Sequence, residues 1–383
     1  MPLNKLSAPI TITQKAEKLS ETFFPTDYKS ILQKLENIDP FKYAQTRNFT
    51  DGAVTYLSPY ISRGVLSLPQ IKEHVLKSYK PYQVEKFLQE LAWREYWQRV
   101  WQAIGNKIFI DIIQEQPNVV HHKMVAAIEN ADTGIDAIDD NIELLYSTGY
   151  MHNHVRMYLS SIACNVAKAH WLQPSQWLYY HLLDGDLASN SLSWQWVAGT
   201  FSSKKYYCNQ ENINRYTKSN QQQTFLDRSY EEITNMRIPE ELLDKSNFFA
   251  QTVLPEKIVP TLKEGLPIII YNSYNIDPLW HSGEPANRIL LLEPAHFKAH
   301  PVSSKVLQFI TDLSKNIADI QIFAGNFEEL KNLSGDRDII FKSHPTTLHY
   351  EGIAENYNDM FPQVTGYFSS FSSYWKKCSK YSD

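Results

Sequence analysis

Four short β-rich runs after residue 250 constrain the fold most strongly. They are LPIIIY (266–271), RILLLEP (288–294), DIQIFAG (319–325) and DIIFKSHP (338–345). Two helical patterns, SSKVLQFITDLSKNI and NFEELKNL, stand between these runs. Strands that alternate with helices favour a parallel sheet, so the sequence predicts a small α/β domain over residues 250–383. This segment has no GxGxxG or GxxxxGK[ST] motif, and no nucleotide site is predicted there.

The first 245 residues carry mainly helical patterns. In residues 81–113, apolar positions that include Phe87, Leu91 and Ala92 repeat at helical spacing. We expect another helix from about Met151 to His170, and polar surface structure over residues 204–246. Because a single core rarely grows beyond about 300 residues, we predict two domains. The predicted fold class is mainly α, with a helical domain over residues 1–245 and the α/β domain after it.

Composition limits the cellular setting and the partners. The 37 Lys and Arg residues against 42 Asp and Glu give a net charge of -5, which argues against a generally basic nucleic-acid-binding surface but allows a local basic groove. Three cysteines without a CxxC pair cannot build a zinc knuckle or a four-cysteine cluster, and no metal is predicted. No secretory signal and no apolar run of about 18 residues is present, so we expect a cytoplasmic protein without a membrane span.

The stretch from residue 148 to residue 200 mixes helix-forming apolar residues with four tryptophans, the arginine Arg156 and the sequence Asp184-Gly185-Asp186. A purely structural core does not need this mixture, which indicates that something polar and something aromatic are bound there. Taken alone, the two aspartates are more typical of a helix cap or a weak cation site than of a catalytic centre.

Two further groups are open to a structural and a functional interpretation. On the predicted helix, Glu90 and Arg94 are four residues apart, and Trp93 shares their surface. A surface ion pair is the simple interpretation of the two charges. Thr55 and Ser58 precede a predicted helix, where they either cap it or hold an anion such as a phosphate.

Several motifs together resemble the flavin-binding helical domain of the cryptochrome and photolyase family. The two longest are YMHNHVRMYL (150–159) and LLDGDLASNSLSWQW (182–196). Three shorter ones, YAQTRN, TYLSPY and ELAWREY, stand at residues 43–48, 55–60 and 90–96. The motifs occur in the family's order, and the resemblance covers roughly residues 40 to 205.

The resemblance implies a U-shaped, non-covalent FAD buried among helices. Arg156 and Asp184 would form a buried pair beside the isoalloxazine, Asp186 would accept a hydrogen bond from the flavin or the ribose, and Asn190 would face flavin N5. Val54 departs from the family, which usually has a hydroxyl there. The residues implied at the phosphates are Tyr43, Thr55, Leu57, Ser58 and Arg94.

The family also implies a pocket for a pyrimidine dimer that is flipped out of UV-damaged DNA. A protonated Glu90 would donate to the carbonyls of the dimer, and Trp194 and Trp171 would supply electrons to the flavin. Two departures are His154, where the family has Arg, and the lack of a third tryptophan near Asn118. The residues implied in the lesion pocket are Arg47, Glu90, Trp93, Asn153, Met157 and Trp196.

The resemblance implies a light-driven flavoprotein. The first hypothesis is a deoxyribodipyrimidine photolyase, a carbon–carbon lyase that repairs cyclobutane pyrimidine dimers with an electron from excited FADH⁻. The second is a cryptochrome-like blue-light photoreceptor, and the third is a binding module without photochemistry. Family members carry an antenna-binding α/β domain before the flavin domain, whereas the α/β segment here follows it. This order suggests a permuted antenna-like domain or an unrelated module, and it argues against an antenna chromophore.

Overall fold

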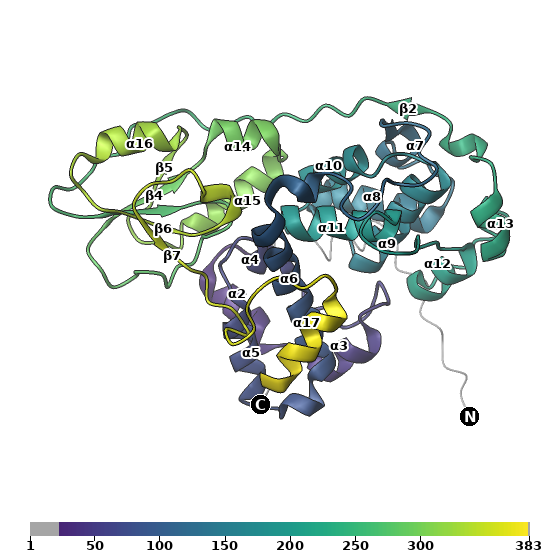
Figure 1. Ribbon diagram of the computed structural model, residues 1–383, viewed down its shortest axis with the longest axis horizontal. Helices are drawn as coiled ribbons and strands as arrows, with labels where there is room; N and C mark the ends of the chain where they lie inside the picture. Colours follow the sequence, from purple (N-terminus) through teal and green to yellow (C-terminus); the bar gives the residue numbers. More distant parts are fainter. Residues whose placement is uncertain (1–22, 382–383) are drawn as a thin grey trace.

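The computed structural model describes residues 23–381 (Figure 1). Helices dominate up to residue 245, and a five-stranded sheet lies in the C-terminal region. The mainly helical fold with a C-terminal parallel sheet is thereby confirmed, whereas the division near residues 245–250 stays a prediction. The predicted helical domain also includes residues 1–22, which lie outside the described part of the chain. Among residues 23–381, no helix is long and apolar enough to cross a membrane.

Side-chain caps start many of the helices in the first part of the chain. Asp27 accepts a hydrogen bond from the backbone N–H of Ser30, and Ser67 accepts one from Gln70, because the first N–H groups of a helix lack partners within it. The helices up to the long central helix are α2 (Tyr28–Glu36), α3 (Pro40–Thr46), α4 (Ser58–Ser62), α5 (Leu68–Leu76), η1 (Pro81–Gln83) and α6 (Glu85–Ile104).

The helices after α6 complete the helical part. The predicted helix from Met151 to His170 is shorter than expected, because α9 passes into a π-helical turn, η3, after Ser161. The elements are η2 (Gly105–Phe109), β1 (Met124–Val125), α7 (Ala126–Glu129), α8 (Asp136–Thr148), α9 (Asn153–Ser161), η3 (Ile162–Val166), α10 (Leu172–His181), α11 (Leu187–Ala198), α12 (Gln210–Thr217), α13 (Tyr230–Asn235), η4 (Glu240–Leu242) and β2 (Lys245–Ser246), which pairs with β1.

The C-terminal sheet is parallel throughout, in the order β5-β4-β3-β6-β7. Four of its strands lie within the predicted runs, whereas β7 was not predicted. Successive side chains of a strand point to opposite faces, so Ile269 and Tyr271 share a core with α15, and Ile268 and Ile270 share one with α16. The elements are β3 (Ile268–Tyr271), β4 (Asn287–Leu291), α14 (Pro294–Ala299), α15 (Ser304–Ser314), β5 (Gln321–Phe323), α16 (Phe327–Ser334), β6 (Ile339–Lys342), η5 (Pro345–Thr347), β7 (Ile353–Glu355), α17 (Phe371–Cys378) and η6 (Ser379–Tyr381).

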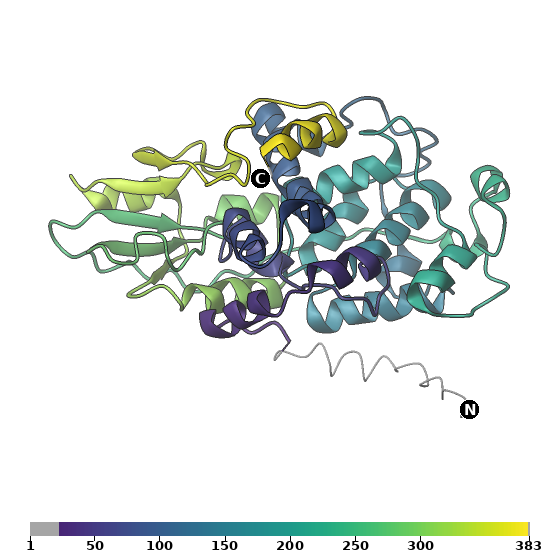
Figure 2. The same ribbon diagram turned by 90° about the horizontal axis from the view of Figure 1, so that it is seen from below.

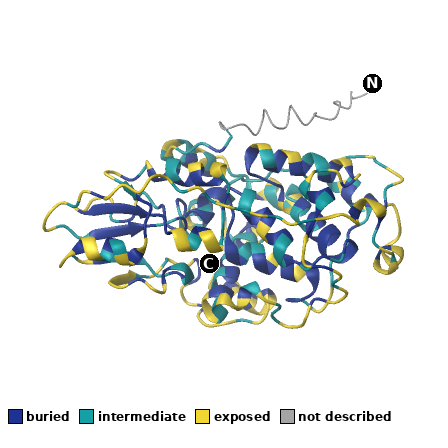
Figure 3. Cartoon of the chain, turned by 90° about the horizontal axis from the view of Figure 1, so that it is seen from above, coloured by how far each residue is buried: buried dark blue, intermediate teal, exposed yellow. Residues whose placement is uncertain are grey.

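The largest hydrophobic core joins the helices to the sheet. It runs from Phe24 through α5 and α6 to α15 and α17. After the sheet the chain returns to the helical part, and Figure 2 shows α17 among its helices. An extended segment over residues 247–264 connects the two parts along the surface, where Figure 3 shows it as mostly exposed in contrast to the buried strands. The sheet and the helices therefore support each other.

Candidate functional site

A cavity of about 680 Å³ opens among the helices of the first part. Trp171 is the one predicted site residue that does not line it. This tryptophan is fully buried, and its Nε1–H donates to Asp111 Oδ1 at 2.7 Å. The predicted residues that line the cavity are Tyr43, Arg47, Thr55, Leu57, Ser58, Glu90, Trp93, Arg94, Asn153, Arg156, Met157, Asp184, Asp186, Asn190, Trp194 and Trp196.

Helical spacing explains why residues distant in sequence meet at this cavity. On α6, Glu90, Trp93, Arg94 and Trp97 are separated by the three- and four-residue steps that place side chains on one side of a helix. The same steps on α11 bring Ser189, Asn190, Ser193, Trp194 and Val197 to the opposite wall. Their apolar and polar atoms form a wall that suits a ligand with both characters.

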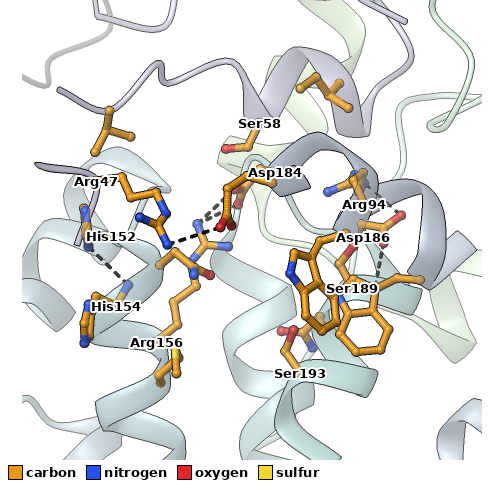
Figure 4. A pocket seen from close by; sticks show the side chains of 18 of the residues that line it. Arg47, Ser58, Arg94, His152, His154, Arg156, Asp184, Asp186, Ser189 and Ser193 are labelled. Atoms are coloured by element: carbon orange, nitrogen blue, oxygen red, sulfur yellow. Dashed lines mark hydrogen bonds and ion pairs between the residues drawn. The ribbon is translucent and has the colours of Figure 1, made fainter. Parts of the chain in front are cut away.

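One side of the cavity is held by a buried ion pair. Arg156 Nη2 lies 3.0 Å from Asp184 Oδ1 and 2.9 Å from Oδ2, and Arg156 Nε donates to the carbonyl of Met151 (Figure 4). Burial favours a raised pKa of Asp184, but the Arg156 guanidinium and the Ser58 hydroxyl lower the pKa of this carboxyl below its ordinary value. Asp184 is therefore an ionised carboxylate with a fixed partner.

The second aspartate is held by several weaker contacts. Asp186 Oδ1 accepts from the N–H of Ser189 at 2.7 Å, so this residue caps α11. Its Oδ2 accepts from Gln98 Nε2 at 2.5 Å and lies 3.6 Å from Arg94 Nη2. Arg94 Nη2 also donates to Ser62 Oγ at 2.6 Å. The helix-cap interpretation of the sequence is thus confirmed for Asp186, and the carboxylate also belongs to the cavity wall.

The charges around Glu90 differ from the sequence prediction. Glu90 Oε1 lies 2.8 Å from Lys86 Nζ and 3.2 Å from Arg47 Nη2, whereas Arg94 turns to Asp186. The expected Glu90–Arg94 ion pair is therefore wrong, because both side chains find closer partners of opposite charge. Two cationic side chains therefore lie beside this carboxylate at the cavity.

Aromatic side chains shape the open side of the cavity. Trp93 stacks on Phe371 of α17, with ring centroids 3.6 Å apart and an interplanar angle of 10°. Trp196 is 38% exposed, and Asn153 is also exposed. One face of Trp93 is thus covered by the C-terminal helix, a contact that the sequence did not reveal because residue 371 is distant and α17 carries no recognisable motif.

The two histidines at the start of α9 are neutral. The N–H of His154 donates to His152 Nδ1 at 3.2 Å, and the His154 ring stacks on Tyr216 at 4.6 Å. Burial lowers the pKa of both histidines to about 4. His152 is the N-cap of α9. At neutral pH, His154 does not supply the positive charge that the family places there.

Sequence reasoning missed other residues at or beside the cavity, and four of them matter most for its chemistry. Tyr150 lines the cavity with its ring 5.6 Å below the Arg156 guanidinium, and the Ser189 hydroxyl is buried without a partner in the described chain. Trp97 lines the wall, and Gln98 holds Asp186. Helical spacing from Glu90 and Trp93 was enough to find Trp97, whereas nothing local marked Gln98.

The cavity fits the FAD that the resemblance implies. Asn190 Nδ2 donates to the carbonyl of Ser175 at 2.9 Å, and this contact fixes the orientation of the amide. Its Oδ1 can then accept a hydrogen bond from an N–H group. The unpartnered hydroxyl of Ser189 and the guanidinium groups of Arg94 and Arg156 offer donors to a polar, anionic ligand. Apolar and aromatic walls provide a surface for a planar ring system.

Comparison with known proteins gives a match in the same region. Residues 87–252 match the family described as the FAD binding domain of DNA photolyase. The deoxyribodipyrimidine photo-lyase of Escherichia coli (strain K12) is 29% identical over 211 residues, which is 51% of this chain and 44% of that protein. Cryptochrome DASH of Danio rerio is 31% identical over 170 residues, or 41% of this chain and 32% of that protein. The chain spans less than half of the length of these relatives.

Solved structures include similar chains at lower identity. The Synechocystis sp. PCC6803 cryptochrome has a TM-score of 0.45 and 24% identity, with 50% of this chain and 43% of that chain covered. A class III photolyase from Agrobacterium tumefaciens has a TM-score of 0.41 and 22% identity, with 56% and 48% covered. The identification rests on the sequence matches: through its FAD-binding domain, the chain belongs to the cryptochrome and photolyase family.

Proposed function

We propose that this protein is a light-driven DNA photolyase that repairs cyclobutane pyrimidine dimers. The observation that carries the proposal is that one cavity is lined both by the residues implied for FAD and by those implied for a flipped dimer. The buried Arg156–Asp184 pair and the cap at Asp186 lie on its inner walls, whereas Trp196 and Asn153 lie at exposed positions. A cofactor inside and a base entering from solvent suit this division.

The inner residues bind and orient the cofactor. The fixed pair of Arg156 and Asp184 holds a donor and an acceptor at one place, so that neither charge is left unpaired when water is excluded. Asn190 presents Oδ1 as an acceptor, because its Nδ2 is used by Ser175. When bound and reduced, FAD supplies the light-driven electron that opens the cyclobutane ring.

The outer residues receive the lesion. Stacking on an exposed aromatic side chain such as Trp196 contributes about 1–3 kcal/mol per base. Trp93 presents a ring whose other face is fixed by Phe371, so it is preorganised for such a contact. Arg47 and Lys86 neutralise Glu90 and add positive charge at the opening, which favours approach of a phosphate backbone.

A blue-light photoreceptor is the second candidate, and two observations favour it. His154 is neutral where the family has a cationic Arg, which weakens contact with DNA. The C-terminal helix packs on Trp93, so α17 contacts the wall of the cavity directly. In this alternative, a change in the cavity on illumination would be passed to α17.

The experiment is repair of UV-irradiated oligothymidylate by the FAD-loaded, reduced protein under blue light, with a dark sample as control. Photolyase activity predicts recovery of intact thymine absorbance only in the light. Trp196→Ala should weaken binding of the irradiated oligonucleotide roughly tenfold, whereas Phe249→Ala, at an exposed aromatic of the connecting segment, should not. A protein that binds and reduces FAD but restores no thymine would exclude repair and favour the photoreceptor.

A further inference from the structure

The topology of the sheet singles out one place at its carboxyl edge. The chain starts at the central strand β3, adds β4 and β5 on one side and then returns to add β6 and β7 on the other. Neighbouring strands β3 and β6 therefore lead into loops that run in opposite directions, and such a switch point is where open α/β sheets usually bind ligands. Tyr274 follows β3 and His344 follows β6. Their rings stack at 4.5 Å with an interplanar angle of 27°.

In this protein the start of α11 occupies that place. The backbone N–H of Leu187, the first residue of α11, donates to the hydroxyl of Tyr274 at 3.3 Å. His344 Nε2 lies 3.3 Å from Oε1 of Gln98, whose Nε2 donates to Asp186 at 2.5 Å. Residues from two neighbouring strands thus reach the same end of one helix. Leu187, Tyr274 and His344 are buried, and Gln98 is half-buried.

The hydrogen bonds that run from Thr346 through His344 and Gln98 to Asp186 all have the same direction. The N–H of Thr346 donates to His344 Nδ1 at 3.3 Å, and the Thr346 hydroxyl lies 2.8 Å from the same nitrogen, to which it can also donate. With Nδ1 as the acceptor, we assign the proton of the neutral ring to Nε2. Burial lowers the pKa of His344 to about 4, so the ring carries a single proton at neutral pH. Nε2–H then donates to Gln98 Oε1, which turns the amide so that its Nε2 faces Asp186.

Asp186 connects these hydrogen bonds to the wall of the cavity. It caps α11, and the helix then presents Ser189, Asn190 and Trp194 to the cavity. We propose that the carboxyl edge of the sheet positions the flavin-facing helix α11, with His344 as a positioning residue that acts through Gln98 on Asp186. The inference rests on the proposed FAD site, and it gives the sheet a role in that site instead of a ligand of its own at the switch point.

The test compares three variants by two measurements. The first is the dissociation constant of FAD, and the second is hydrogen exchange of the backbone over residues 186–190, which needs no cofactor. His344→Phe removes the Nε2–H donor and should raise the dissociation constant roughly tenfold and speed exchange at the start of α11. His344→Gln carries an amide N–H that can reach the Nε2 position, so it should restore both values to within about twofold.

The matched control is His300→Phe. His300 has a low pKa of about 4 because it is also buried, but it stacks on Phe109 and takes no part in the chain to Asp186. It should leave both measurements unchanged. Equal effects of His300→Phe and His344→Phe, or no rescue by His344→Gln, would overturn the positioning role. A wild-type protein that binds no FAD would instead refute the proposed function, and hydrogen exchange would still decide whether His344 positions α11.

Discussion

The two aspartates of the cavity stand two residues apart and are held in different ways. Asp184 has one strong partner, Arg156, and both belong to the helical part. Asp186 caps a helix, lies 3.6 Å from Arg94 and accepts from Gln98, which leads to His344 at the carboxyl edge of the sheet. The first region of the cavity is therefore complete within the helical part, whereas the second depends on how the sheet docks.

Because of this difference, loss of one partner should have effects of different size at the two aspartates. A buried carboxylate with one cationic partner has a large energetic effect when that partner is lost. A carboxylate held by several weaker contacts loses less with each of them, and each loss moves it only slightly. We therefore expect large effects on the Asp184 side and graded effects on the Asp186 side.

The largest effect should follow Arg156→Met. It leaves the carboxylate of Asp184, whose side chain is 5% exposed, without its cation. Removal of one partner of a buried pair costs about 3–5 kcal/mol of the free energy of unfolding, measured by denaturant titration. Lys263→Met in the exposed pair with Asp319 is the control and should have little effect. Equal losses in the two variants would show that the Asp184 side is no stronger than a surface pair.

The second largest effect concerns pH. The pKa of His344 is lowered to about 4 in the folded protein, mainly because the ring is buried. The unfolded chain, with a pKa near 6.5, binds more protons between these two values, so stability is full above about pH 6.5 and falls as pH decreases to 4. His344 contributes up to about 3 kcal/mol to this fall. Asp184 acts lower, because its pKa is depressed and its contribution is lost only below the ordinary value of 3.8.

Denaturant titrations of the wild type and His344→Gln at pH 7 and pH 4.5 measure this contribution. The variant should lose less stability between the two pH values, since it has no ring to protonate. His300→Gln, at a half-buried histidine with a pKa of about 4, should flatten the same pH range without affecting FAD binding. An unchanged pH dependence in His344→Gln would contradict a neutral, buried His344.

A smaller effect is expected for Gln98→Leu. This variant keeps the size of the side chain but removes the N–H that donates to Asp186 at 2.5 Å. A hydrogen bond to a charged group contributes about 1.5–3 kcal/mol, and FAD binding should weaken by a similar or smaller amount. Gln102→Leu, at an exposed position of the same helix, is the control. If both variants bind FAD equally well, Gln98 does not connect the sheet to the cavity.

The sequence predicted residues of the cavity and strands of the sheet correctly where a motif or a periodic pattern lies within one segment of the chain. Helical spacing and the quoted motifs were sufficient to predict Glu90, Trp93, Arg156 and Asn190 as neighbours of one cavity, and the β-rich runs predicted four strands of the sheet. β7 escaped because it is only three residues long and follows no helical pattern.

Contacts between distant segments were not predictable in this way. Glu90 pairs with Arg47 because α3 approaches α6, and this packing has no local signal. Its other partner, Lys86, lies four residues earlier on α6, a spacing that the sequence does contain. The link from His344 to Asp186 spans the sheet, helix α6 and helix α11, and each of its residues is unremarkable in its own segment. Hydrogen-bond partners across such distances follow from docking, which periodicity does not specify.

The smallest effect should follow Tyr274→Phe, and it separates the stack on His344 from the hydrogen bond with Leu187. Phenylalanine keeps the stack on His344 but loses the hydroxyl that accepts from Leu187 at 3.3 Å, a neutral hydrogen bond worth about 1 kcal/mol. Tyr271→Phe is the matched control, since its hydroxyl donates to the carbonyl of Trp280 at 2.8 Å in the same sheet. Both variants should lose similar stability, but only Tyr274→Phe should speed hydrogen exchange at Leu187. Faster exchange in both would mean that α11 responds to any weakening of the sheet, and Asp186 would then be held by general packing and not by specific contacts from the carboxyl edge.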